Sequence, residues 1–245
     1  MNPKYGLCCL SIVLLVSLQS CLSIVTDRQA IHGSGKLSEE TYKFSGLTGV
    51  QLTTRGELDI RLGDMEELRI EADENLLHYF EAEKDGDVLR IGTRQGFSVR
   101  PSGAVHYTLT VKELESIGLS SSGNAHAPAI ATDHFEIRIS SSGDLSMDGI
   151  EASSLDVQIS SSGDVKIGEG LVDKQEIRIS SSGDYYAESV RSGEAKVRSS
   201  SSGDARLWAE ESLDATLSSS GSVYYKGDPK IDDSHSSSGR VRRIR

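Results

Sequence analysis

The chain has little cysteine, few aromatic residues and almost no long apolar runs. Only three of its 245 residues are cysteine, and two of these, Cys8 and Cys9, lie close to the N-terminus. A disulfide framework is therefore excluded, and a domain that begins after residue 21 depends on its core alone for stability. The apolar stretch 7–18 is too short to span a bilayer comfortably, and no later stretch could form a transmembrane helix.

Several motifs of catalytic and nucleotide-binding sites are also missing. The six histidines share no spacing typical of metal ligands, and neither a Gly-x-Ser-x-Gly nucleophile elbow nor a phosphate-binding loop occurs. The formal net charge of −11 argues against nucleic acid as a partner and against broad electrostatic binding to anionic lipid. The sequence therefore predicts no cofactor and no nucleic-acid partner.

What the chain has instead is a repeat. The block Ser-Ser-Ser-Gly recurs along its second half, and the last two intervals are slightly shorter than the others. Its glycines are Gly123, Gly143, Gly163, Gly183, Gly203, Gly221 and Gly239. Self-similarity at a nearly fixed period of this size is the signature of a solenoid.

Apolar residues alternate with polar ones on both sides of each repeat glycine. Around Gly143, for example, Phe135, Ile137 and Ile139 precede the glycine and Leu145 and Met147 follow it, all in the same phase. Side chains alternate across a strand, so each repeat predicts two strands with one inward face, joined by a bend. The expected fold is all-β: a single-stranded right-handed parallel β-helix with about 20 residues per coil. The serine two places before each glycine shares the inward phase, and the serines on either side of it point outward.

The segment 1–40 predicts targeting and attachment rather than fold. Lys4, the apolar run and Leu18-Gln19-Ser20-Cys21 indicate a signal peptide over residues 1–20. The last four residues of this motif resemble the lipobox of bacterial lipoproteins, which implies lipidation of Cys21 and a membrane partner through that anchor; an ordinary cleaved signal peptide is the alternative. Residues 21–40 are polar and are expected to form a tether.

Residues 41–245 predict one β-helix domain, with an irregular part over 41–112 and regular serine-rich coils over 113–245. Within the irregular part, the segment 54–57 fits the later repeat as a degenerate coil, and 73–80 predicts a short helix with Asp73 as its N-cap. Asp85-Gly86 indicates a hairpin turn. The strand over 105–111 is expected to be the last one before the regular array. The final coil is polar, as a terminal repeat must be to prevent end-to-end stacking.

Two sets of residues are candidates for binding. Stacked coils place one acidic residue per coil along one edge of the solenoid. This row is a weak candidate for a calcium site, because each coil supplies only a single carboxylate. A role in the turns is the simpler interpretation of these residues. These residues are Asp144, Asp164, Asp184 and Asp204. Where the rows of identical outward side chains are interrupted, large side chains form a candidate contact patch for a glycan or a protein on a cell surface. These residues are Tyr186, Arg206, Trp208 and Tyr224.

The serine-rich blocks at this period, such as Ser160-Ser161-Ser162-Gly163-Asp164, the segment 70–77 and the ending 223–229 resemble the auto-transporter adhesin "head GIN domain" family over about residues 40 to 243. The resemblance implies a right-handed β-helix on the bacterial cell envelope and transfers no catalytic residues. The expected function is a non-enzymatic lipoprotein of the envelope, anchored in the outer membrane, that serves adhesion or surface binding. The alternative is a carbohydrate-active β-helix, such as a polysaccharide lyase or hydrolase.

Overall fold

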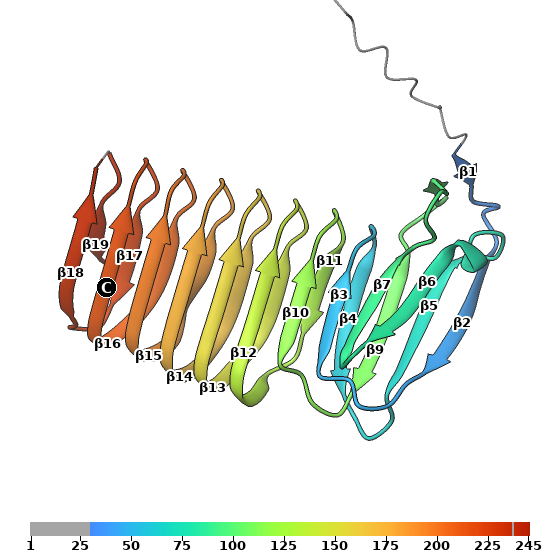
Figure 1. The fold of residues 1–245 in the computed structure, drawn as a ribbon, viewed down its shortest axis with the longest axis horizontal. Helices are drawn as coiled ribbons and strands as arrows, with labels where there is room; N and C mark the ends of the chain where they lie inside the picture. Colours follow the sequence, from blue (N-terminus) through green and yellow to red (C-terminus); the bar gives the residue numbers. More distant parts are fainter. Residues whose placement is uncertain (1–29, 237) are drawn as a thin grey trace, which may run out of the picture.

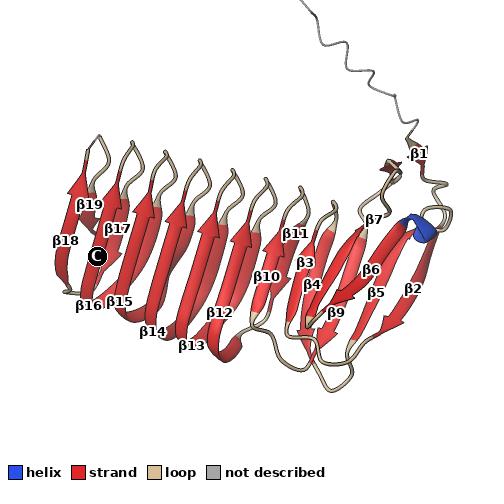
Figure 2. Ribbon diagram, in the orientation of Figure 1, coloured by secondary structure: helices blue, strands red, loops and turns tan. Residues whose placement is uncertain are grey.

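The computed structural model describes residues 30–236 and 238–245, so the expected signal peptide, Cys21 and Ser237 lie outside the described residues. The described chain is a solenoid of stacked coils (Figure 1). Followed toward the C-terminus, it runs up the near face, turns at the serine blocks along the upper ridge and returns down the far face, which is a right-handed parallel β-helix. Figure 2 shows that strands make up nearly all of the coils. None of the described residues forms a helix long and apolar enough to cross a membrane.

The regular coils stack in parallel, and each residue pairs with the residue one repeat further along the chain. Ile137, for example, is the register partner of Val157, which in turn pairs with Ile177, and all three are fully buried. The predicted inward phase is therefore confirmed by the core. After the first coil, which is described below, the strands of this array are β12 (Ile130–Ile139), β13 (Leu145–Ile159), β14 (Val165–Ile179), β15 (Tyr185–Ser199), β16 (Ala205–Leu217), β17 (Val223–Lys226), β18 (Lys230–His235) and β19 (Val241–Arg243).

The repeat glycines provide room for close stacking of the turns. None of them has a positive φ. A Cβ atom on Gly163 would lie 2.1 Å from the carbonyl oxygen of Gly143, and the next glycine along, Gly183, has the same relation to Gly163 at 2.2 Å. The repeat glycines are therefore needed for the room they leave between turns and not for a positive φ. Where they are described, the serines two places before the glycines are half-buried, whereas the serines on either side are exposed.

The coil next to the regular array is not the one expected from chain order. The first coil of the array is β10 (Ser116–Leu119) with β11 (Asn124–Ala127), and it pairs with β3 (Gly49–Leu52) and β4 (Glu57–Leu62). The segment 54–57 is thus the turn of an early coil, as predicted. β9 (His106–Val111) is the last strand before the array in the chain, as predicted. In space it lies one coil further out, parallel to β4, beside β7 (Val88–Thr93) on β3.

An antiparallel layer covers the N-terminal end of the solenoid. β5 (Glu67–Asp73) runs antiparallel to β9 on one side and to β2 (Leu37–Lys43) on the other. β6 (Phe80–Asp85) forms a hairpin with β7 through Gly86, whose φ is +63°, as the Asp-Gly signal predicted. Two short strands, β1 (Ile31–His32) and β8 (Val99–Arg100), pair in parallel beside this layer. Residues 31–32 and 37–40 therefore belong to strands, and a tether reaching residue 40 is wrong.

The short helix predicted over 73–80 is reduced to a 3-10 turn over Leu77–Tyr79, and Asp73 is not its N-cap. Asp73 ends β5 and is buried. Its carboxylate accepts hydrogen bonds from the backbone N–H of Gly35 at 2.6 Å, the backbone N–H of Ser102 at 2.9 Å and the hydroxyl of Ser102 at 2.6 Å. This carboxylate therefore ties two loops to β5 instead of starting a helix.

Candidate functional site

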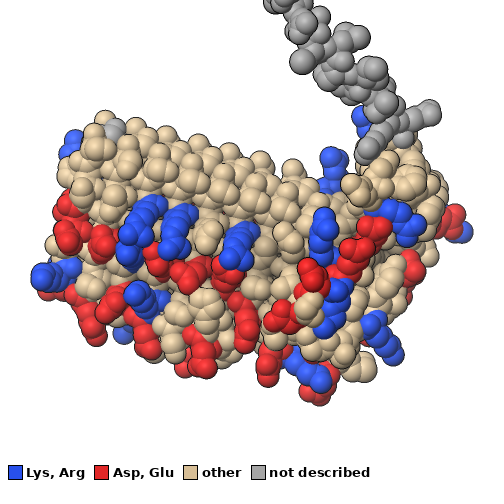
Figure 3. Space-filling view, viewed as in Figure 1, with Lys and Arg blue, Asp and Glu red and all other residues tan. Residues whose placement is uncertain are grey.

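The two broad faces of the solenoid carry different outward side chains. On the face seen in Figure 3, the ridge of serine turns over the regular coils is uncharged, and rows of basic and acidic side chains run beneath it. The basic row includes Arg138, Arg178 and Arg198, which pair with Glu136 or Glu176 of the acidic row. On the far face, the strands that follow the serine turns carry the predicted aspartates and the predicted contact patch.

The four aspartates form a hydrogen-bonded ladder along one edge of the far face. Oδ1 of Asp144 accepts a hydrogen bond from the backbone N–H of Asp164 at 2.9 Å, and Oδ1 of Asp164 accepts one from Asp184 at 2.8 Å. The pattern continues to Asp204 and then to Ser222, each at 2.7 Å. Each carboxylate thus satisfies a backbone donor of the next coil, which a simple turn residue would not do.

The aspartate ladder has a structural use that requires no metal. Among residues 30–236 and 238–245, no group of three or more His, Cys, Asp or Glu side chains lies close enough to hold a metal ion. Burial, together with the charges of Asp184 and Asp144, raises the pKa of Asp164, although the hydrogen bond from the Asp184 N–H works in the opposite direction. The geometry therefore explains the aspartates as acceptors between coils, with burial of the charge first and like-charge repulsion second as the cost.

Replacing Asp164 with asparagine should stabilise the protein at pH 7. An amide oxygen can still accept the Asp184 N–H, as Asn124 already does for Asp144 at 3.0 Å, while the cost of burying the charge and the repulsion both disappear. Because the group is partly exposed and screened, we expect a gain in unfolding free energy of about 0.5 kcal/mol. The folded pKa is raised, so the cost is complete above that pKa and disappears as the pH falls below the unfolded value of about 3.9. Urea titrations at pH 7 and about pH 3 should show a gain only at pH 7, and exposed Asp173→Asn should show none.

The structure brings three of the four predicted contact residues into one row. Register partners place Lys166, Tyr186, Arg206, Tyr224 and Arg242 side by side on successive coils, so basic and aromatic side chains alternate. The guanidinium of Arg206 lies 4.8 Å from the ring centroid of Tyr224, a cation–π distance.

Tyr186 within this row is tied to the aspartate ladder. Its hydroxyl donates to Oδ2 of Asp184 at 2.7 Å. That hydrogen bond, burial of the ring and the charges of Asp184 and Asp164 raise the pKa of Tyr186 to about 12. The ring is therefore held in a fixed position on the far face as a neutral phenol at physiological pH.

Trp208 lies outside this row and is largely occupied by its neighbours. The guanidinium of Arg191 and the ammonium of Lys226, on the coils before and after it, lie 4.5 and 5.7 Å from its ring centroid. Arg191 reaches this place because the coil of Trp208 is shorter than the coils before it, which shifts the register between Tyr186 and Arg191. Trp208 is thus a less available contact than the sequence suggested.

A hollow of about 440 Å³ opens at the other end of the row. It lies over the small side chain of Ser146, between His126 on one side and Lys166 and Tyr186 on the other. His126 lies 3.2 Å from Asp148 and 3.7 Å from Asp59. His126, Ser146 and Lys166 were not among the predicted contact residues, although all three stand three places after a repeat glycine, as Tyr186 does. Taking that position through every repeat would have found them.

The chain belongs to a known protein family. The model of the family described as "Putative auto-transporter adhesin, head GIN domain" matches residues 46–229, which is most of the chain. The resemblance inferred from the serine-rich blocks is thereby confirmed. No curated protein is significantly similar to the chain in sequence.

Solved structures share the fold. A "putative adhesin" from Bacteroides fragilis is 24% identical, with a TM-score of 0.81, over 88% of this chain and 100% of that one. A "putative lipid binding protein" from Parabacteroides distasonis is 23% identical, with a TM-score of 0.70, over 89% and 100%. A "putative adhesin" from Parabacteroides merdae is 17% identical, with a TM-score of 0.67, over 88% and 99%. At these identities the likeness shows the fold alone.

Proposed function

We propose that this protein is a lipid-anchored adhesion module of the bacterial cell envelope, attached through Cys21 to the outer membrane, that binds a glycan or a protein on a surface without chemically changing it. The observation that supports this most is the row from Lys166 to Arg242, in which groups recur with the coil along much of the array. Repeated groups of this kind suit an extended or repetitive partner.

Catalysis would need a different arrangement. It requires two or three unlike groups that converge on one point with separated pKa values. The groups with shifted pKa on this face are Asp164 and Tyr186. Asp164 accepts a hydrogen bond from the backbone of Asp184 on the next coil, and the Tyr186 hydroxyl donates to the Asp184 carboxylate, so both groups hold the structure in place. The inside of the coils is filled with buried apolar side chains, so a ligand would contact the outer faces. These features favour surface binding over a lyase or hydrolase.

The proposal predicts that adhesion depends on Cys21. Cells producing the parent protein should keep it in the membrane fraction and adhere to surfaces coated with pectin, alginate or glycosaminoglycans, or to host cells. Cys21→Ser should release the protein or leave its precursor unprocessed, and adhesion should fall to the level of cells without the protein. Cys9→Ser, which lies within the expected signal peptide, is the matched control and should behave like the parent.

The same incubations test the absence of catalysis. The coated polymers are assayed for new reducing or unsaturated ends after contact with the cells. Adhesion that persists at full strength in Cys21→Ser would contradict the anchor. Product formation that depends on the protein would contradict the binding role.

A further inference from the structure

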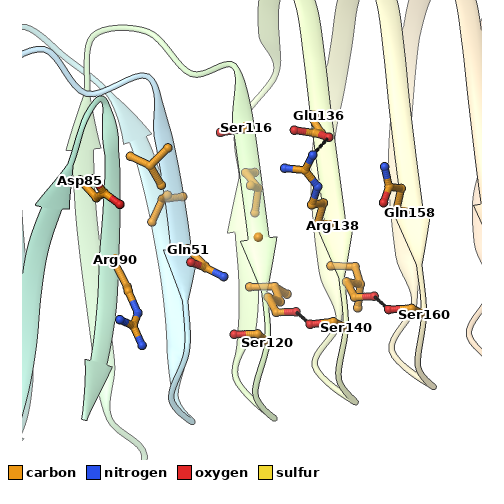
Figure 4. A pocket seen from close by; sticks show the side chains of 16 residues that line it. Gln51, Asp85, Arg90, Ser116, Ser120, Glu136, Arg138, Ser140, Gln158 and Ser160 are labelled. Atoms are coloured by element: carbon orange, nitrogen blue, oxygen red, sulfur yellow. Dashed lines mark hydrogen bonds and ion pairs between the residues drawn. The ribbon is translucent and has the colours of Figure 1, made fainter. Parts of the chain in front are cut away.

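A second hollow, of about 420 Å³, lies on the near face where the irregular part meets the regular coils. Five register partners cross it in a row: Arg90 on β7, Gln51 on β3, Gly118 on β10, Arg138 on β12 and Gln158 on β13. Gly118 is the member of this row without a side chain, so the row is interrupted there (Figure 4). We call this hollow the Gly118 groove.

Planar polar groups surround the groove on several strands. Figure 4 shows Arg90 and Gln51 on one side, Arg138 and Gln158 on the other, and the hydroxyl-bearing Ser120, Ser140 and Ser160 along the serine turns. Amides and hydroxyls both donate and accept hydrogen bonds, and guanidinium groups donate two in parallel. The half-buried Val88 adds an apolar wall.

The groove carries no formal net charge. Its two arginines are balanced by Asp85 and Glu136, and Arg138 is held in an ion pair with Glu136 on its own strand. Figure 4 shows the guanidinium of Arg90 directed away from Asp85 and toward the level of Gln51 and Ser120. The lining therefore has no excess charge to attract an ion, whereas an uncharged ligand with many hydroxyls could pair with its guanidinium groups, amides and hydroxyls throughout.

We propose that the Gly118 groove is a binding subsite for an uncharged sugar residue of a glycan or polysaccharide. The sugar ring occupies the place of the missing side chain, with its C–H groups against Val88 and the Gly118 backbone. Its hydroxyls pair with Gln51, Arg138 and Gln158, and the serine ridge continues the contact along the coils. This assignment rests on the proposed surface-binding function and names the chemical class of one ligand.

Filling the groove tests the proposal. The three atoms nearest to a Cβ on Gly118 all belong to Gln51, and the nearest is in its flexible side chain at 3.3 Å, so Gly118→Gln should fold normally while occupying the sugar position. Thr216→Gln adds a comparable side chain in the same row, well beyond the groove, and is the matched control. The full-length protein is passed over immobilised mannan, xylan, galactan and β-glucan, with polygalacturonate as the anionic comparison.

We expect the parent protein and Thr216→Gln to be retained by at least one uncharged polymer, and Gly118→Gln to bind it at least tenfold more weakly with an unchanged melting temperature. Gln158→Ala should weaken binding severalfold. Retention should change little between low and high salt, since no charge pairing is involved. Retention only on polygalacturonate, no retention on any uncharged polymer, or equal retention by Gly118→Gln would each overturn the subsite. Cells carrying Gly118→Gln that still adhere would leave the proposed function standing.

Discussion

Gly163→Ala should unfold or severely destabilise the solenoid, although it adds a single methyl group. The new Cβ would lie 2.1 Å from the carbonyl oxygen of Gly143 and 2.8 Å from that of Ser141, both backbone atoms of the preceding turn. Neither can move without disturbing the stacking hydrogen bond from the Gly163 N–H to the Ser141 oxygen, which is 3.0 Å long. We expect a loss of about 3 kcal/mol or more in unfolding free energy.

A glycine elsewhere in the chain provides the control. Gly103 has no atom within 4 Å of its ideal Cβ position and no positive φ, so Gly103→Ala should change stability little. Urea titrations of both variants and the parent, followed by circular dichroism, measure the difference. Similar midpoints for Gly163→Ala and the parent would mean that the turns are not stacked closely enough for a Cβ on Gly163 to meet the Gly143 carbonyl oxygen.

The regular coils could be predicted because their information is local and repeated. The alternation around Gly143 fixes which side chains point inward, and the period of the serine blocks fixes their register, so Phe135 packs beside Leu155 as expected. The alternation in 105–111 equally gave a strand and its buried face. It could not give its partner: Tyr107 pairs with Leu58 and Ile70, from two segments whose order in space differs from their order in the chain.

In the candidate site, too, the residues placed by the repeat could be predicted, and those placed by pairing between distant segments could not. The period placed Tyr186, Arg206 and Tyr224 in one row because all three stand three places after a repeat glycine. The surroundings of Trp208 depend on where its coil is shortened, which the sequence does not mark. The Gly118 groove depends on Arg90 and Gln51, which reach the row only through pairing between distant segments.

Asp73→Ala should destabilise the N-terminal cap strongly, because it removes an acceptor shared by three donors. Without the carboxylate, the Gly35 N–H, the Ser102 N–H and the Ser102 hydroxyl all lose their hydrogen-bond acceptor, at a site where Asp73 is buried. Hydrogen bonds to charged groups contribute about 1.5 kcal/mol or more each, so we expect a loss of at least about 2 kcal/mol at pH 7. Exposed Asp133→Ala removes a carboxylate of the same kind and should change the midpoint little.

The pH dependence separates this role from simple packing. The hydrogen bonds from Ser102, side chain first and then backbone, lower the pKa of Asp73 below its usual value, and the Gly35 N–H adds to the effect. The folded pKa therefore lies below the unfolded value of about 3.9, so the stabilisation is complete above that value and is lost as the pH falls through the folded pKa. In urea titrations from pH 7 to pH 2, the difference between the parent and Asp73→Asn should shrink below about pH 4. A difference that stays constant over this range would show that the charge of Asp73 does not hold the two loops.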